Sequence, residues 1–156
     1  MLLKFINRFL FKKIITTYKK KYFSSERQYN QMGLNLTILP IVYHESYIDS
    51  TKYLADIIIT EKLSDKYLLE IGRTCGLISV FAAKKGATIS VFVDNDSVLS
   101  TLKTNFEVND AVISYVANSF NEISLKQKQD YIIINPPNIN SNSDDWERFS
   151  WNFTDN

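Results

Sequence analysis

Residues 67–94 read YLLEIGRTCGLISVFAAKKGATISVFVD, and this stretch decides the fold. A short apolar run over 67–71 ends at a glycine turn, and a helix is predicted over 77–85 with Gly86 at its end. A second apolar strand is predicted over 88–93. Short apolar strands alternating with helices are typical of a parallel sheet buried on both faces. The pattern predicts a doubly wound α/β fold whose ligand lies outside the carboxyl ends of the strands.

The same alternation continues on both sides of this stretch. Downstream, we expect a helix over 97–109 and strands over 112–116 and 131–134. Upstream, Gly33 marks a turn, and a strand broken by Pro40 is predicted over 34–42. A helix over roughly 51–62 follows, which Asp49 or Ser50 can cap. Its predicted buried face consists of Leu54, Ile57 and Ile58.

The first 22 residues carry seven Lys or Arg and no acidic residue, whereas the rest has eleven basic and seventeen acidic residues. Apolar residues recur at helical spacing over 2–21, which predicts an amphipathic helix. This basic helix either packs on the domain or faces a nucleic acid or a membrane surface. The sequence alone leaves both interpretations open.

Composition limits the other classes. A chain of 156 residues, 45% hydrophobic and 22% charged, is typical of one globular domain. Cys75 is the only cysteine, so an intramolecular disulfide is excluded, and with His44 as the only histidine no metal site is predicted. No apolar run is long enough to span a bilayer, and no cleavable signal is recognisable, so we expect a cytoplasmic protein.

Two features at predicted strand ends indicate a nucleotide-like ligand. The turn Glu70-Ile-Gly72-Arg-Thr-Cys-Gly76 lets the backbone approach a ligand, although many α/β proteins have such a turn for packing alone. Asp94 ends the next strand, where a carboxylate can accept hydrogen bonds from both hydroxyls of a ribose. Alternatively, Asp94 is a helix N-terminal acid, and Asp96 competes for the ribose role.

The most specific motif is Asn135-Pro136-Pro137-Asn138, directly after the apolar strand over 131–134. Two prolines fix two φ angles and remove two backbone donors. The Asn135 side-chain oxygen and the Pro136 carbonyl remain as rigid acceptors. Such a pair can hold an amide or an exocyclic amine by its hydrogens, with the nitrogen lone pair directed at an incoming methyl group. The alternative is a simple turn.

Together these motifs resemble the class I S-adenosylmethionine-dependent methyltransferases of the Asn-Pro-Pro type. The group includes release-factor glutamine methyltransferases and small-domain ribosomal RNA guanine methyltransferases. The resemblance covers about residues 34–138 and implies a Rossmann-like sheet, here with about four core strands of the usual seven. We expect the N-terminal helix and a β extension to lie outside this core.

The resemblance implies roles for individual residues. Asn135, Pro136, Pro137 and Asn138 stand on the catalytic tetrapeptide. The positions implied to bind S-adenosylmethionine are Glu70, Gly72, Arg73, Thr74, Gly76, Asp94, Asn118 and Thr51. Asn105 and Asn109 match a recurrent asparagine pair on the following helix. Residues 49–51 are similar to a segment that closes over the cofactor.

Three positions depart from the family pattern. Thr74 replaces a glycine in the turn, Asn118 stands where aspartate is common, and Asn138 replaces an aromatic residue that stacks on the target. The chain also has only 19 residues after Pro137, so the strand over 131–134 is expected to be uncovered on one side.

We therefore expect four segments: a basic helix and turn over 1–33, a strand–helix cap over 34–66, the cofactor-binding core over 67–138 and a polar, aromatic tail over 139–156. The expected activity is N-methylation of a protein glutamine or a nucleic-acid base, with a lean towards ribosomal RNA or a ribosome-associated factor. Self-association through the uncovered edge is a further expectation. The alternatives are a non-catalytic module that needs a partner chain and a nicotinamide-dependent oxidoreductase. The latter is disfavoured because only Gly72 and Gly76 of its fingerprint are present.

Overall fold

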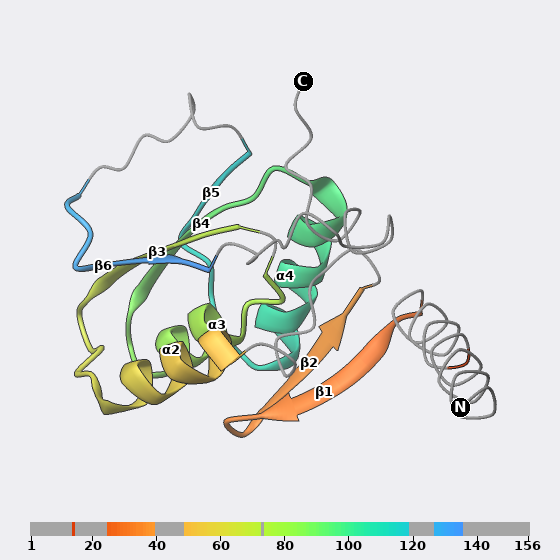
Figure 1. Ribbon diagram of the computed structural model, residues 1–156. Helices are drawn as coiled ribbons and strands as arrows, with labels where there is room; N and C mark the ends of the chain where they lie inside the picture. The colour runs from red at the N-terminus through yellow and green to blue at the C-terminus, as the bar shows by residue number, and fades with distance from the viewer. Residues whose placement is uncertain (1–13, 15–24, 40–48, 73, 119–126, 136–156) are drawn as a thin grey trace, which may run out of the picture.

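The computed structural model describes residues 14, 25–39, 49–72, 74–118 and 127–135, and these contain the four parallel strands that the apolar segments predict. They are β3 (Tyr67–Ile71), β4 (Thr88–Phe92), β5 (Tyr115–Ala117) and β6 (Tyr131–Ile134), in the spatial order β5-β4-β3-β6. The predicted Rossmann-like sheet is therefore confirmed for this part of the chain (Figure 1).

The helices that connect these strands cover one face of the sheet. α3 (Leu77–Lys84) joins β3 to β4, and α4 (Asp96–Val108) joins β4 to β5. Both crossovers run in the same direction along the sheet, so their shared handedness places both helices on the same face (Figure 1). The core lies between this face and the helices. It includes Leu68, Ile89, Val91, Leu77, Val98 and Leu102.

An antiparallel hairpin, β1 (Arg27–Gln31) and β2 (Leu34–Ile38), packs outside the sheet against α4 and α3 (Figure 1). Its two-residue turn, Met32-Gly33, has positive φ angles of 55° and 74°, as hairpin turns that match strand twist require. The strand predicted over 34–42 ends at Ile38, and β1 was not predicted at all. The hairpin therefore spans residue 33, where the sequence suggested a segment boundary.

Two side-chain amides, one in α4 and one at its C-cap, take the place of a partner strand for β2. Asn109 Oδ1 accepts from the Asn35 N–H (3.0 Å), and its Nδ2 donates to the Asn35 carbonyl (2.8 Å). Asn105 repeats this pair of bonds with Thr37, at 2.7 Å and 2.9 Å. Four helical residues advance about 6 Å and two strand residues about 6.8 Å, so the spacings match. Both asparagines are buried, and their amides satisfy the outer edge of β2.

Some local predictions are wrong. α2 (Asp49–Thr60) begins at Asp49, so Asp49 and Ser50 lie inside its first turn rather than before it. Its buried residues include Ala55 and Ile58, whereas Ile57 is 58% exposed because it lies well round the helix from them. β5 begins at Tyr115, three residues later than predicted.

Asp130 joins the amino ends of β3 and β6. Its Oδ2 accepts from the Tyr67 N–H (2.9 Å), and its Oδ1 lies 3.1 Å from the Lys66 ammonium. The bond from the Tyr67 N–H and then the bond from Lys66 lower the pKa of this carboxyl. A backbone bond from the Asp130 N–H to the Tyr67 carbonyl (2.8 Å) completes the junction. It helps to fix the β3–β6 register, in which Ile71 pairs with Ile134.

α3 and α4 end in the same hydrogen-bonded motif but with different residues. After α3, the Gly86 and Ala87 N–H groups donate to the Ala83 and Ala82 carbonyls. After α4, the Asp110 and Ala111 N–H groups make the equivalent bonds to the Glu107 and Phe106 carbonyls. The residue in the left-handed conformation is Gly86 in one case and Asp110, with a φ of 52°, in the other.

We expect Asp110→Gly to stabilise the fold by about 0.5–1 kcal/mol, because it relieves the left-handed strain and removes an acid from a helix C-terminus. The reverse exchange, Gly86→Asp, is the control and should lower stability by at least as much, because its Cβ would also lie 3.4 Å from Ser64 Cα. Urea denaturation of both variants measures the change in unfolding free energy. A loss of stability in Asp110→Gly would contradict the argument.

Candidate functional site at the carboxyl edge of the sheet

The parallel register brings four motif positions to one edge. Ile71 pairs with both Phe92 and Ile134, and Phe92 pairs with Ala117. The chain leaves this edge at Gly72, Asp94, Asn118 and Asn135. Backbone bonds continue just past the strands, from Gly72 N–H to the Phe92 carbonyl (3.2 Å) and from Val93 N–H to the Ala117 carbonyl (2.9 Å). Residues from four separate segments therefore share one surface.

The strand order reverses between β3 and β6 at this edge. β4 and β5 extend the sheet to one side of β3, and β6 lies on its other side. Loops that leave adjacent strands in opposite directions open a crevice between them, which is where open α/β sheets bind ligands. Gly72 and Asn135 are the first residues after the two strands at this reversal.

Glycine is needed at the two positions of the turn for different physical reasons. Among the described residues, no atom lies within 4 Å of a Cβ built on Gly72, and its φ of 134° lies in a region that side chains rarely adopt. A Cβ on Gly76 would lie 2.6 Å from Leu102 Cδ2, so Gly76 permits close packing of the turn against α4. The open space at Gly72 is compatible with a ligand against the backbone, whereas Gly76 serves the fold.

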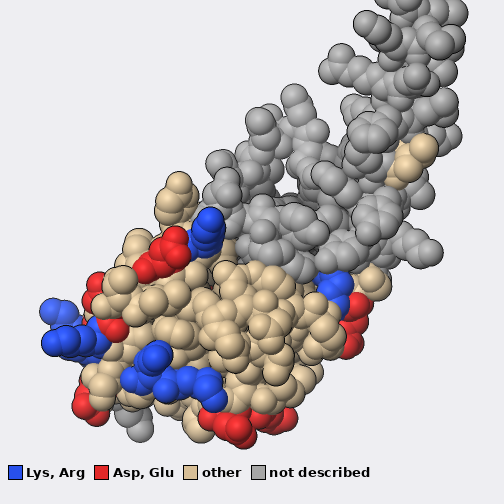
Figure 2. Space-filling view, turned by 90° about the horizontal axis from the view of Figure 1, so that it is seen from below, with Lys and Arg blue, Asp and Glu red and all other residues tan. Residues whose placement is uncertain are grey.

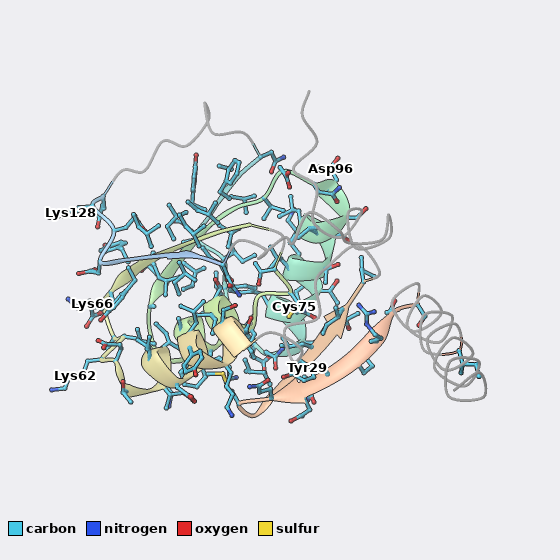
Figure 3. All side chains as sticks on the ribbon, in the orientation of Figure 1. Tyr29, Lys62, Lys66, Cys75, Asp96 and Lys128 are labelled. Carbon is cyan, nitrogen blue, oxygen red and sulfur yellow. The ribbon has the colours of Figure 1, made fainter. Side chains whose placement is uncertain are left out.

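Thr74, which stands where the family pattern has glycine, takes part in the turn itself. Its Oγ1 accepts from the Gly76 N–H (2.9 Å). The carbonyl of the same peptide unit, that of Cys75, accepts from Asn105 Nδ2 (2.8 Å). Cys75 is fully buried beside α4 (Figure 3). Arg73, also predicted to bind the cofactor, lies outside the described residues.

Glu70 lies below the turn, on the face that the helices cover. It is 5% exposed, and the Ser79 hydroxyl in α3 donates to its carboxylate. The acid predicted at this position is therefore tied to the first turns of α3. It stands one residue before the end of β3, close to the carboxyl edge of the sheet.

Asn95 caps the N-terminus of α4. Its side-chain oxygen accepts from the Ser97 and Val98 N–H groups, at 2.9 Å and 3.2 Å. Asp94 is exposed and precedes this cap, while Asp96 is the first residue of the helix. Asp94 thus follows β4 by two residues, Asp96 belongs to α4, and the capping role falls to a third residue. Asn118 is exposed after β5.

The side chain of Asn135 is held by the first turn of α2. Ser50 Oγ donates to Asn135 Oδ1 (2.8 Å), and Asn135 Nδ2 donates to Thr51 Oγ1 (2.8 Å). Thr51 is buried at 3% exposure. These two bonds hold the amide between two hydroxyl groups, with Oδ1 accepting from Ser50 and Nδ2 donating to Thr51. Ser50 was not among the predicted site residues. Pro136, Pro137 and Asn138 lie outside the described residues.

The sequence prediction missed two contributors, Ser50 and Asn105. Neither stands in a recognisable motif beside the turn or the tetrapeptide, and their contacts span 85 and 30 positions of the chain. The only available signals were the resemblance of residues 49–51 to a closing segment and the recurrent asparagine pair. Within the described ranges, no group of three His, Cys, Asp or Glu residues is placed to hold a metal ion. No helix in the same ranges has the length and apolar character to cross a bilayer.

The family model of the methyltransferase small domain matches residues 33–154. The chain belongs to the methyltransferase small domain family. A Methanocaldococcus jannaschii protein named for protein N5-glutamine methyltransferase activity is 35% identical over 114 residues, which is 72% of this chain and 55% of that protein. The chain therefore spans about half the length of this relative.

Solved structures agree on the fold of this small methyltransferase domain. The 16S rRNA N2 G1207 methyltransferase of T. thermophilus, solved with AdoMet and guanosine, superposes with a TM-score of 0.59 at 20% identity. The match covers 76% of this chain and 34% of that one. The M. jannaschii tRNA m1G37 methyltransferase gives a TM-score of 0.59 at 19% identity, over 73% and 34% of the two chains. At these identities the likeness shows the fold.

Proposed function

We propose that this chain binds S-adenosylmethionine at the carboxyl edge of the sheet and methylates a planar nitrogen, either a protein glutamine amide or an exocyclic amine of a nucleic-acid base. One observation carries the proposal. Asn135 lies beside the strand-order reversal with its amide fixed by Ser50 and Thr51, next to the open space at Gly72. Membership of the family supports the same activity and argues against the oxidoreductase alternative.

The residues present suit this cofactor. Gly72 leaves space against the backbone for its methionine part, and Asp94 offers a carboxylate to its ribose hydroxyls. Asn118 is exposed directly after β5, and its side-chain oxygen can accept a hydrogen bond from the adenine amine. We also assign Glu70, Thr74, Gly76 and Thr51 to the site, as residues that support the turn or Asn135. When bound, the cofactor supplies an electrophilic methyl group on a sulfonium.

In the proposed reaction the protein orients the target nitrogen. Asn135 Oδ1 has two lone pairs, and the Ser50 hydroxyl uses one, so the other is available to one hydrogen of the target nitrogen. The Pro136 carbonyl is proposed to accept the second hydrogen. Two acceptors on one –NH₂ group direct its lone pair out of the acceptor plane and stabilise the positive charge that grows on nitrogen.

The substrate class remains broad in this proposal, with a lean towards ribosomal RNA or a ribosome-associated protein. The support is the basic segment over 1–22. On the face shown in Figure 2, basic and acidic side chains lie in small separate groups, most of them near the rim, with uncharged side chains between them. Any nucleic-acid contact of the described domain on this face is therefore local rather than an extended basic surface.

Asp94→Ala should weaken binding of S-adenosylhomocysteine at least about tenfold, because it removes a charged acceptor for two hydroxyls. Asp96→Ala is the matched control: it removes an acid two residues away and should leave affinity nearly unchanged. Isothermal titration calorimetry on the full chain measures both. Equal losses in the two variants, or no binding by the folded wild-type chain, would overturn the assignment of the cofactor edge.

Asn135→Ala should reduce methyl transfer by about 100-fold or more, since it removes an acceptor that acts on the developing charge. Affinity for S-adenosylhomocysteine should stay within about threefold, because the variant leaves Asp94 and the turn intact. Thr51→Val keeps the side-chain shape but removes the acceptor of Asn135 Nδ2. We expect it to reduce methyl transfer less than Asn135→Ala does.

The assay is transfer of a labelled methyl group from S-adenosylmethionine to a glutamine-containing peptide and to ribosomal RNA. Undiminished transfer by Asn135→Ala would rule out its catalytic role. Cofactor binding with no transfer by the wild-type chain to either acceptor would instead support the non-catalytic module.

We further propose that β6 mediates self-association. In the described part of the sheet β6 pairs with β3 alone, and Ile132 and Ile134 are 60% and 56% exposed. An apolar strand edge of this kind favours pairing with another chain. Sedimentation velocity should show a dimer that Ile132→Lys with Ile134→Lys removes. Val112→Lys, at an exposed apolar residue before β5, should keep it. A monomeric wild-type chain would contradict the proposal.

A further inference from the structure

Asn105 contacts two parts of the structure at once. Its Oδ1 and one Nδ2 hydrogen bind the N–H and carbonyl of Thr37 in β2. The second Nδ2 hydrogen binds the Cys75 carbonyl in the glycine turn, at 2.8 Å. The side chain is 0% exposed and uses both of its donors and its acceptor oxygen. It is therefore rigidly held between the hairpin and the turn.

Asn109, one helical turn away, provides a natural comparison. It makes the same pair of bonds to β2, through Asn35. Its second Nδ2 hydrogen goes to the Asn105 carbonyl within α4, at 2.7 Å, and not to the turn. The two asparagines thus hold the hairpin alike, and they differ in the group that accepts this one remaining hydrogen.

The bond from Asn105 acts on a peptide unit that is fixed at its other end as well. The Cys75 carbonyl and the Gly76 N–H belong to one planar unit. Asn105 holds the oxygen, and Thr74 Oγ1 accepts from the nitrogen at 2.9 Å. A peptide plane held on both sides cannot flip without breaking both bonds. The path of the turn between Gly72 and α3 is thereby restricted.

From this geometry we propose that Asn105 is a positioning residue for cofactor binding. It holds the Cys75–Gly76 peptide, together with Thr74, in the orientation that keeps the backbone at Gly72 open to the ligand. The inference rests on the proposed function for its cofactor, but the fixing of the turn is a property of the chain without any ligand. Restricting a binding loop before the ligand arrives reduces the ordering cost of binding.

The test compares Asn105→Ala with Asn109→Ala. Both variants lose two bonds to β2, so both should lower global stability. Only Asn105→Ala releases the turn. We expect the affinity for S-adenosylhomocysteine to fall about tenfold in Asn105→Ala and about twofold or less in Asn109→Ala. The Gly76 amide, monitored by NMR hydrogen exchange without ligand, should exchange about tenfold faster in Asn105→Ala than in Asn109→Ala.

Thr74→Val supplies a second route if Asn105→Ala does not fold. It removes the acceptor of the Gly76 N–H at a half-buried position and leaves the hairpin bonds intact. Faster Gly76 exchange and weaker cofactor binding are expected again. The same exchange rate and the same affinity in the two asparagine variants, or in Thr74→Val and wild type, would overturn the inference. Faster Gly76 exchange in a chain whose wild type binds no cofactor would uphold the fixing of the turn and reject the proposed function alone.

Discussion

The hydrogen bonds between two asparagine amides of α4 and the backbone of β2 are the interaction on which this arrangement depends. Without them, the N–H and carbonyl groups of Asn35 and Thr37 would meet the side of a helix, whose own backbone groups are already paired. A primary amide carries a donor and an acceptor at nearly the spacing of a strand residue, so it can replace one. This allows a β-hairpin to cover a helix, and it brings Leu34, Leu36 and Ile38 into the core.

The sheet and the helices beside it have separate consequences for the site. Parallel register and the reversal of strand order decide which residues meet: Gly72, Asp94, Asn118 and Asn135 arrive at one edge for topological reasons. The Asn135 side chain and the glycine turn are then fixed by elements outside the sheet. α2 holds Asn135 through Ser50 and Thr51, and α4 holds the glycine turn through Asn105. A site on strand ends thus acquires its rigidity from the flanking layer.

The sequence predicts the parts whose structure is local. β3 and β6 have the predicted bounds, since short apolar runs bounded by turn residues are typical of strands. The predicted burial on both faces holds for β3 but not for β6, in which Ile132 and Ile134 are exposed. β1 reads Arg-Gln-Tyr-Asn-Gln, which has no apolar run, and its strand structure depends on pairing with β2. The site shows the same division. Asn135 and the glycine turn are visible as motifs, whereas Ser50 and Asn105 act through contacts distant in sequence that only the folded chain reveals.

Thr74 shows why a departure from a family pattern has to be judged by its contacts. Glycine at this position would leave the Gly76 N–H without the Thr74 hydroxyl oxygen as its acceptor. Threonine supplies that acceptor and, as a β-branched residue, narrows the conformations open to the turn. The flexibility that glycine gives such a loop is exchanged for a fixed peptide plane, while the glycines at 72 and 76 keep the two positive φ angles that the path requires. The replacement therefore restricts the turn through the bond from the Gly76 N–H, and no atom of the described residues, Thr74 included, lies within 4 Å of a Cβ built on Gly72.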